Sequence, residues 1–189
     1  MLTQIYGVTL RLLLLRAGPQ DLPYAPSATP LYAGAMVLLS YLAYALVTPG
    51  AAAAMAALGA YAGLALLTRE LLRARKLSNR YEQTLHALLA ASVVFGLLTL
   101  WPFAQVAPVL VSAAANPAML EHPDRLPLPD GPMLVLNLLA FWKLAVTAHI
   151  YRQAVDSGFG LGLLVALMLE LVQLSMMMLG AVIARLLFG

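Results

Sequence analysis

The sequence predicts an all-α, polytopic integral membrane protein with five transmembrane helices and an N-terminal amphipathic helix in the membrane interface. Of its 189 residues, 62% are hydrophobic and only 10% are charged, and the mean hydropathy is +0.87. A soluble domain carries about 25% charged residues, so this chain has too few to cover a water-facing surface. Its apolar residues also form blocks of about 20, the number that crosses ~30 Å of hydrocarbon as a helix. We therefore expect one membrane domain over residues 1–189.

Residues 1–30 are expected to form an interfacial helix and a linker. The stretch from Leu2 to Arg16 is apolar, but it is too short to span a bilayer and Arg11 interrupts it. Such a helix lies along the membrane with its apolar face down and its arginines at the headgroups. It lacks the uninterrupted apolar run and the cleavage site of a signal peptide. Residues 18–30 are rich in proline, which predicts a non-helical connection.

Five apolar segments follow, separated by turn-forming or charged residues. Trp101-Pro102 closes the third segment with an aromatic anchor of the kind that lies at the headgroup level. Residues 104–131 hold five prolines and are expected to form a long outer loop, of which residues 106–115 are apolar enough to dip into the interface. The five spans are expected at residues 31–47, 51–67, 84–103, 132–151 and 159–184.

The basic residues predict the orientation of the chain. With the N-terminus in the cytoplasm, the inner side holds Arg11, Arg16, Arg69, Arg73, Arg75, Lys76, Arg80 and Arg152, and the outer side only Arg125 and Arg185. Such an excess of basic residues marks the cytoplasmic side of a membrane protein. Arginine outnumbers lysine, and both alanine and leucine are abundant. This composition favours a bacterial genome. We expect a bacterial inner membrane protein whose C-terminus is periplasmic.

Two oppositely charged residues fall inside expected spans. Lys143 lies in the fourth span and Glu170 in the fifth, and each costs about 2.5–3.5 kcal/mol without a partner. A short loop joins these spans, so the two residues are expected to form an ion pair, with Asn137 or Gln173 as further hydrogen-bond partners. The pair is interpreted either as a structural clamp or as a proton or ion relay. The clamp is favoured because the first three spans hold almost no polar residues that could line a pathway.

Two histidines are expected at a similar depth near the inner face. His86 lies early in the third span and His149 late in the fourth. Such a pair could bind a b-type haem or supply two of the ligands of a metal ion. An interfacial histidine, however, more often bonds a carbonyl or faces headgroups. We expect no cofactor and no metal. Residues 121, 122 and 124 (Glu, His and Asp) are interpreted as ordinary solvated loop residues.

Small and basic residues predict contact surfaces. Gly59 and Gly63 form a GxxxG pattern that lets another span or another subunit approach closely. The glycines at residues 158, 160 and 162 predict a tight turn and close packing at the start of the last span. The basic run is expected to face lipid headgroups or a protein partner, and nucleic acid is excluded because these residues cluster beside spans; it comprises Arg69, Arg73, Arg75, Lys76 and Arg80.

One segment resembles a known family. The fourth span and its exit, NLLAFWKLAVTAHIYRQAV from Asn137 to Val155, are similar to the stretch before the last helix of bacterial Yip1-like proteins. A cytoplasmic N-terminal segment, five spans and an outward C-terminus also resemble the layout of the Yip1 family. The resemblance implies a role in membrane organisation or trafficking through helix and partner contacts, and it implies no enzymatic activity.

The leading functional hypothesis is a non-enzymatic membrane scaffold or accessory subunit that packs against lipid, other membrane proteins or itself. The absence of cysteine excludes disulfides, thiolate metal sites and iron–sulfur clusters. The first alternative is a small transporter or proton-relay protein that uses Lys143 and Glu170. The second is a b-type haem electron-transfer subunit that uses His86 and His149.

Overall fold

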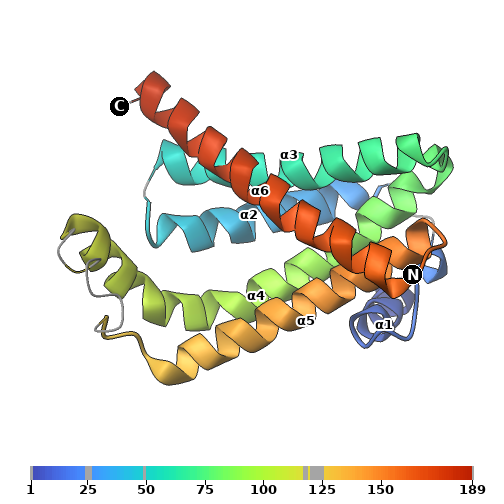
Figure 1. The fold of residues 1–189 in the computed structure, drawn as a ribbon, viewed down its shortest axis with the longest axis horizontal. Coiled ribbons are helices and arrows are strands. Elements are labelled where there is room, and N and C mark those ends of the chain that lie inside the picture. Colours follow the sequence, from blue (N-terminus) through green and yellow to red (C-terminus); the bar gives the residue numbers. More distant parts are fainter. Residues whose placement is uncertain (1, 24–26, 49, 117–118, 120–125, 189) are drawn as a thin grey trace.

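The computed structural model describes residues 2–23, 27–48, 50–116, 119 and 126–188, and every regular element within them is helical (Figure 1). The all-α class that the sequence predicts is therefore confirmed. The helices are α1 (Leu2–Leu13), α2 (Thr29–Ala45), α3 (Ala51–Ala74), α4 (Tyr81–Ala115), α5 (Asp130–Ala154) and α6 (Phe159–Phe188), with the 3-10 turns η1 (Pro19–Asp21) and η2 (Ser78–Arg80).

Four of these helices have the dimensions of membrane spans. Helices α3, α4, α5 and α6 are long and apolar enough to cross a bilayer. Helix α2 is also apolar, but its 17 residues rise only about 25 Å. The chain thus has the helices of a polytopic membrane protein.

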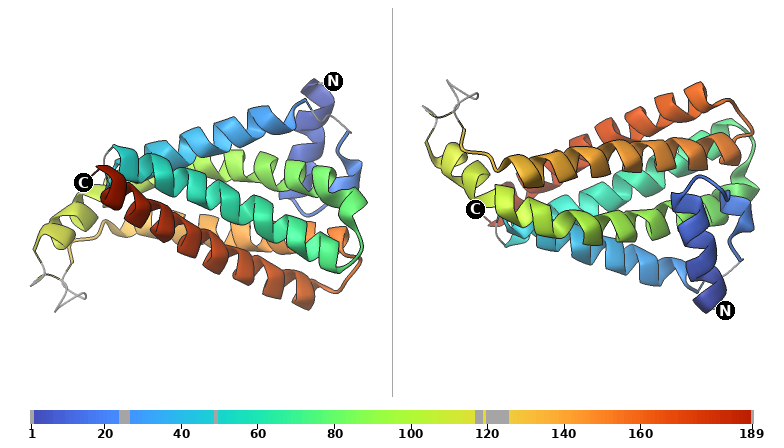
Figure 2. Two further views of the ribbon diagram at one scale, coloured as in Figure 1. Left: turned by 90° about the horizontal axis from the view of Figure 1, so that it is seen from above. Right: turned by 90° about the horizontal axis from the view of Figure 1, so that it is seen from below.

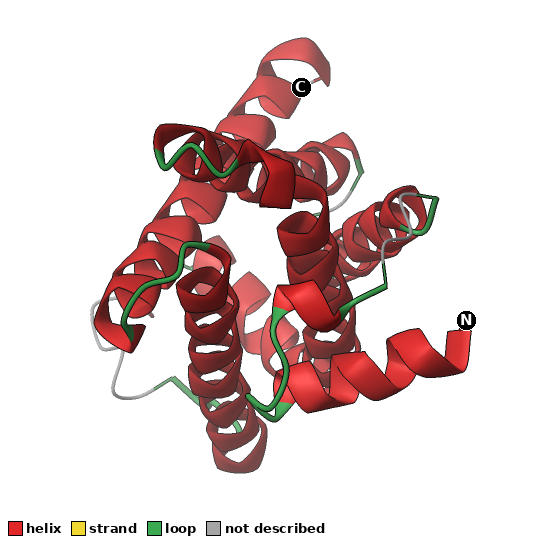
Figure 3. Ribbon diagram, turned by 90° about the vertical axis from the view of Figure 1, so that its right-hand side faces the viewer, coloured by secondary structure: helices red, strands yellow, loops and turns green. Residues whose placement is uncertain are grey.

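The five longer helices form a closed ring. Contacts join α2 to α3, α3 to α6, α6 to α5, α5 to α4, and α4 back to α2, and Figure 3 shows this ring from one end. Helix α1 and turn η1 lie across that end against α4 and α5 (Figure 2). We call this end the α1 end; it also carries the connections α3–α4 and α5–α6. We call the opposite end the C-terminal end.

The hydrophobic core lies in the half of the ring nearest the α1 end. Residues 146–151 of α5 are all buried, whereas none of residues 130–145 is. Side chains from the other helices complete this core, among them Leu12, Leu64, Leu85, Leu89, Ile150, Val165 and Leu169. Toward the C-terminal end, helices α4 and α5 diverge from α2, α3 and α6 (Figure 1). The bundle is therefore tightly packed at one end and splayed at the other.

Helix α4 extends much further than the sequence predicts. It runs to Ala115 through Pro102 and Pro108, so the expected end at residue 103 and the loop assignment of residues 104–115 are wrong. A proline inside a helix removes one hydrogen bond and bends the helix, but its fixed φ remains helical. The surrounding residues are mainly alanine, valine and leucine, which continue the helix, and its last turns bend away from the bundle (Figure 2).

Two other boundaries differ from the expected ones. Helix α1 ends at Leu13 rather than Arg16, because Leu15 adopts a left-handed φ of 61°. Helix α3 continues to Ala74, beyond the expected end of its span at residue 67. The arginine, glutamate and leucine residues there are good helix formers, so the helix persists after the apolar segment ends.

Candidate functional site: a central cavity with an intramembrane ion pair

The structure brings Lys143 and Glu170 into contact across two neighbouring helices. Lys143 Nζ on α5 lies 2.8 Å from Glu170 Oε1 on α6. The two side chains are 33% and 41% exposed, respectively, so the pair is not sealed between its helices. It faces open space inside the ring.

A close approach of α5 and α6 near the α1 end sets the position of this pair. Gly162 is buried on α6, and a Cβ atom there would overlap the carbonyl oxygen of Ala148 and crowd Arg152. The two helices meet backbone to backbone at this point, as the glycines at the start of the last span predict. They are therefore held together independently of the ion pair.

Helix α6 also packs closely on α3. A Cβ at Gly59 would overlap the backbone carbonyl of Met176, and one at Gly63 would lie 3.2 Å from Gln173 Cα. On the facing helix, Gly180 meets the carbonyl of Met55 in the same way. The GxxxG face of α3 is therefore occupied by α6 of the same chain. Of the two partners that the sequence allowed, another span or another subunit, the structure has another span.

A cavity of about 490 Å³ lies inside the ring and has the ion pair in its wall. All five ring helices contribute to it, and we call it the central cavity. Most of its wall is apolar. Its lining residues are Met36, Leu39, Ser40, Ala43, Tyr44, Ala60, Ser92, Phe95, Gly96, Thr99, Phe103, Leu136, Leu139, Ala140, Lys143, Glu170, Gln173, Leu174 and Met177.

The ion pair forms the floor of the central cavity. Lys143 and Glu170 are the lining residues of α5 and α6 that lie nearest the α1 end, and the cavity continues along these helices to Leu136 and Met177. Seven residues of helix correspond to a depth of about 10 Å. Below the floor, the core residues Val146 and Leu169 are buried. The buried core therefore closes the cavity at the α1 end, and the cavity extends from there toward the C-terminal end.

Four hydroxyl-bearing residues on α2 and α4 also line the central cavity, and sequence reasoning missed them. They are Ser40, Tyr44, Ser92 and Thr99, so the first three spans contribute more polar lining than the expectation of almost none. Thr99 donates its proton to the carbonyl of Phe95, 2.8 Å away. The signal was present as isolated hydroxyl groups within apolar spans, but a hydroxyl is common in such spans, and only the ring places these four together.

The two amides expected to support the ion pair are turned elsewhere. Asn137 Nδ2 donates to the carbonyl of Met133 in its own helix at 2.8 Å, and Asn137 is absent from the cavity wall. Six residues separate it from Lys143, which places it on a different helix face. Gln173 lies on the cavity wall, but its Nε2 donates to Ala60 O on α3 at 3.1 Å. Its amide therefore joins α6 to α3.

The two histidines bind separate parts of the protein. His149 Nε2 lies 2.9 Å from Ala17 O, while His86 Nδ1 lies 3.5 Å from the hydroxyl of Thr29, with its ring against Tyr32. His86 Nε2 is buried without a hydrogen-bond partner among the described residues. No group of three or more metal-ligating side chains occurs in the described part of the chain. A haem bound through His149 Nε2 would have to displace Ala17.

The segment after α1 is anchored on α5 by two side chains. Trp142 Nε1 donates to Leu13 O at 2.9 Å, and His149 bonds Ala17 O two helical turns further on. Trp142 also packs edge-on against Phe95, a residue of the cavity wall, with 5.3 Å between ring centroids. These contacts join residues far apart in the chain, so no local sequence pattern reveals them.

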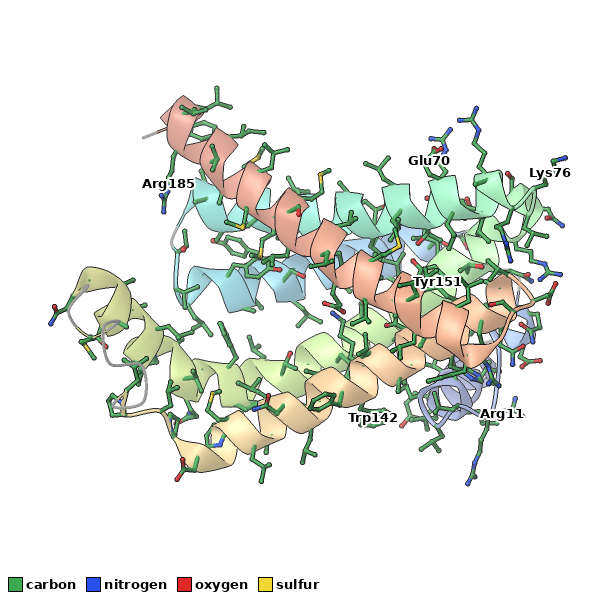
Figure 4. All side chains as sticks on the ribbon, viewed as in Figure 1. Arg11, Glu70, Lys76, Trp142, Tyr151 and Arg185 are labelled. Carbon is green, nitrogen blue, oxygen red and sulfur yellow. The ribbon has the colours of Figure 1, made fainter. Side chains whose placement is uncertain are left out.

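The basic residues gather at the α1 end. Four members of the run, Arg69, Arg73, Arg75 and Lys76, are exposed there, as are Arg11 and Arg16, whereas Arg185 lies at the opposite end (Figure 4). Arg73 pairs within its own helix with Glu70 at 3.8 Å, whereas Arg80 pairs with Asp156 beyond α5 at 2.7 Å and donates to Ala154 O at 3.0 Å. Arg80 ties the start of α4 to the end of α5. The loop residues 121, 122 and 124 lie outside the described residues.

The fold and the site define a helical membrane protein with a ring of five helices around a polar-floored cavity. No family model, curated protein or solved structure matches this chain. The site is therefore the feature that bears on the function.

Proposed function

We propose that the protein is a non-enzymatic integral membrane protein that binds a small molecule in the central cavity at Lys143 and Glu170. One observation carries this proposal: the pair forms the floor of a cavity that is closed at the α1 end and lined by all five ring helices. Its volume of about 490 Å³ falls in the range of about 300–1,000 Å³ that small-molecule sites occupy.

The exposure of the pair favours binding over a purely structural clamp. A clamp is best served by a pair sealed between its helices, since removal from the solvent strengthens the attraction. Here each side chain keeps a third or more of its surface exposed. The ammonium group has three donors and the carboxylate has several acceptor sites, so both retain capacity for a ligand after they bond each other.

The scaffold hypothesis receives less support. It assigned a partner to the small-residue face of α3, and α6 already covers that face at Gly59 and Gly63. Contact with other membrane proteins or with a second copy remains a prediction for the lipid-facing surface. A small transporter is the natural extension of the binding hypothesis, because a cavity closed at one end corresponds to one state of an alternating cycle.

We also propose how the chain sits in the membrane. Helix α2 is the fifth span, and α1 lies in the interface of a bacterial inner membrane with the α1 end in the cytoplasm. The distribution of basic residues supports this orientation. The resemblance of Asn137–Val155 to Yip1-like proteins includes Lys143, which makes a Yip1-like role in membrane organisation compatible with the same site.

A cysteine accessibility experiment tests the cavity. The chain has no cysteine, so single replacements report without background. Ser92 lines the cavity, whereas its neighbour Ala91 is 4% exposed in the core. We expect a small, uncharged methanethiosulfonate reagent added to the protein in proteoliposomes to modify the Ser92→Cys protein and to leave the Ala91→Cys protein unmodified. Equal rates for the two variants, or no reaction at either, would contradict the proposal.

A further inference from the structure

The central cavity carries no net charge. Among its lining residues, Lys143 and Glu170 are the ionic ones, and they are 2.8 Å apart with opposite sign. A ligand with a net charge would have to leave water for an apolar cavity that holds no unmatched counter-charge. That transfer is strongly unfavourable. The site therefore selects against both anions and cations.

The polarity of the α5 and α6 walls changes along the depth of the central cavity. The floor offers ammonium donors from Lys143 and carboxylate acceptors from Glu170. Toward the C-terminal end, the walls of α5 and α6 continue mainly with Leu136, Leu139, Leu174 and Met177, while α2 and α4 place the hydroxyl-bearing residues Ser40, Tyr44 and Thr99 on the facing wall. A molecule that fits this gradient has its polar group at one end and an apolar body about 10 Å long above it.

We infer that, on the proposed function above, the central cavity takes an uncharged amphipathic molecule whose polar end carries both a hydrogen-bond donor and an acceptor. A primary carboxamide on an alkyl chain has this chemistry. Its carbonyl oxygen accepts from Lys143, its NH₂ group donates to Glu170, and its chain lies along the apolar walls. The pair need not separate, because each partner keeps free bonding positions.

Protection of the Ser92→Cys reporter tests this inference with three probes that share one chain and differ in charge. They are octanamide, octanoate and octylamine, each added to proteoliposomes before the thiol reagent. Octanamide is expected to slow the modification at a concentration about tenfold lower than either charged probe, a ratio that corresponds to about 1.4 kcal/mol. The Ala91→Cys protein reports any general effect of the probes on the membrane.

Charge variants make the prediction sharper. In a Glu170→Gln background, Lys143 is left unpaired, and octanoate should become the best protector. In a Lys143→Gln background, octylamine should take that place. Exchange of the two residues, Lys143→Glu with Glu170→Lys, restores a neutral pair and should restore the preference for octanamide. This last variant also controls for loss of the folded protein, since it keeps an ion pair between α5 and α6.

The outcomes separate the ligand class from the cavity itself. If the Ser92→Cys protein does not react, the proposed function fails. If it reacts but a charged probe protects it as well as octanamide does, the cavity stands and the inference about its ligand is overturned. The inference is also overturned if the order of protection does not follow the charge at residues 143 and 170. If a charge variant misfolds, the comparison of the three probes in the Ser92→Cys protein still tests the inference.

Discussion

Among the described residues, Tyr151 is the largest side chain that is fully buried. Tyr151 is fully buried, and its hydroxyl lies 2.8 Å from Thr68 Oγ1 on α3. The Thr68 hydroxyl donates its single proton to Leu64 O at 2.7 Å. Tyr151 must therefore be the donor to Thr68, and the hydrogen bond joins α5 to α3 across the core below the central cavity.

This direction of donation predicts unequal effects of two substitutions. Tyr151→Phe removes the donor and leaves the Thr68 proton satisfied, so it should lower the free energy of unfolding by about 1 kcal/mol. Thr68→Val leaves the Tyr151 hydroxyl buried without an acceptor, which should cost about 1–3 kcal/mol. Unfolding in detergent with increasing sodium dodecyl sulfate measures both. A larger loss of unfolding free energy for Tyr151→Phe than for Thr68→Val would contradict the assignment of Tyr151 as the donor.

At the residue scale, the sequence predicts the intramembrane charges better than the hydroxyl groups. Lys143 and Glu170 stand out because a charge inside a span demands a partner, and a short connection made their helices neighbours. Ser40, Ser92 and Tyr44 carry no such demand, since a hydroxyl is tolerated in an apolar span. They lie together only because α2 and α4, which are not consecutive in the sequence, pack against each other in the ring.

At the scale of elements, the contact between α3 and α6 depends on glycine at specific positions. Gly180 lies against the carbonyl of Met55, whereas a Cβ at Gly34 of α2 would have no atom of another described helix within 4 Å. A glycine-to-alanine change inside a helix normally stabilises by about 0.5–1 kcal/mol. The same change should therefore have opposite signs at these two positions.

We expect Gly34→Ala to leave the stability unchanged or slightly higher, and Gly180→Ala to lower it because α6 must move away from α3. The apparent melting temperature in detergent, followed by size-exclusion chromatography after heating, measures both effects. The displacement of α6 should also break the hydrogen bond from Gln173 to Ala60. Equal stability of the two variants would show that the close approach contributes nothing.

Helix existence was predictable from apolar block length, but helix ends were not. Residues 104–115 are helical although their prolines predict a loop, because a proline bends but does not end a helix whose other residues favour it. Which helices touch was predictable only for neighbours in the chain, such as α5 and α6. The pairs α2–α4 and α3–α6 are separated by other elements, so local patterns do not identify them.

At the scale of the whole molecule, the proposed orientation makes a direct prediction. Thr48 lies at the C-terminal end, between α2 and α3, and Ser78 lies at the α1 end, in η2. A membrane-impermeant maleimide should label the Thr48→Cys protein in cells with a permeable outer membrane. The Ser78→Cys protein should react only after the inner membrane is opened. The reverse pattern would invert the proposed topology.

The closed ring has a consequence for how the protein is made. Helix α6 is the last of the six helices in chain order, yet it contacts both α3 and α5 and so completes the circle. Before α6 is inserted, we expect the nascent chain to form an open arc in which Gly59 and Gly63 lack their packing partner and Lys143 lacks its counter-charge. Insertion of α6 is then expected both to neutralise Lys143 and to close the ring.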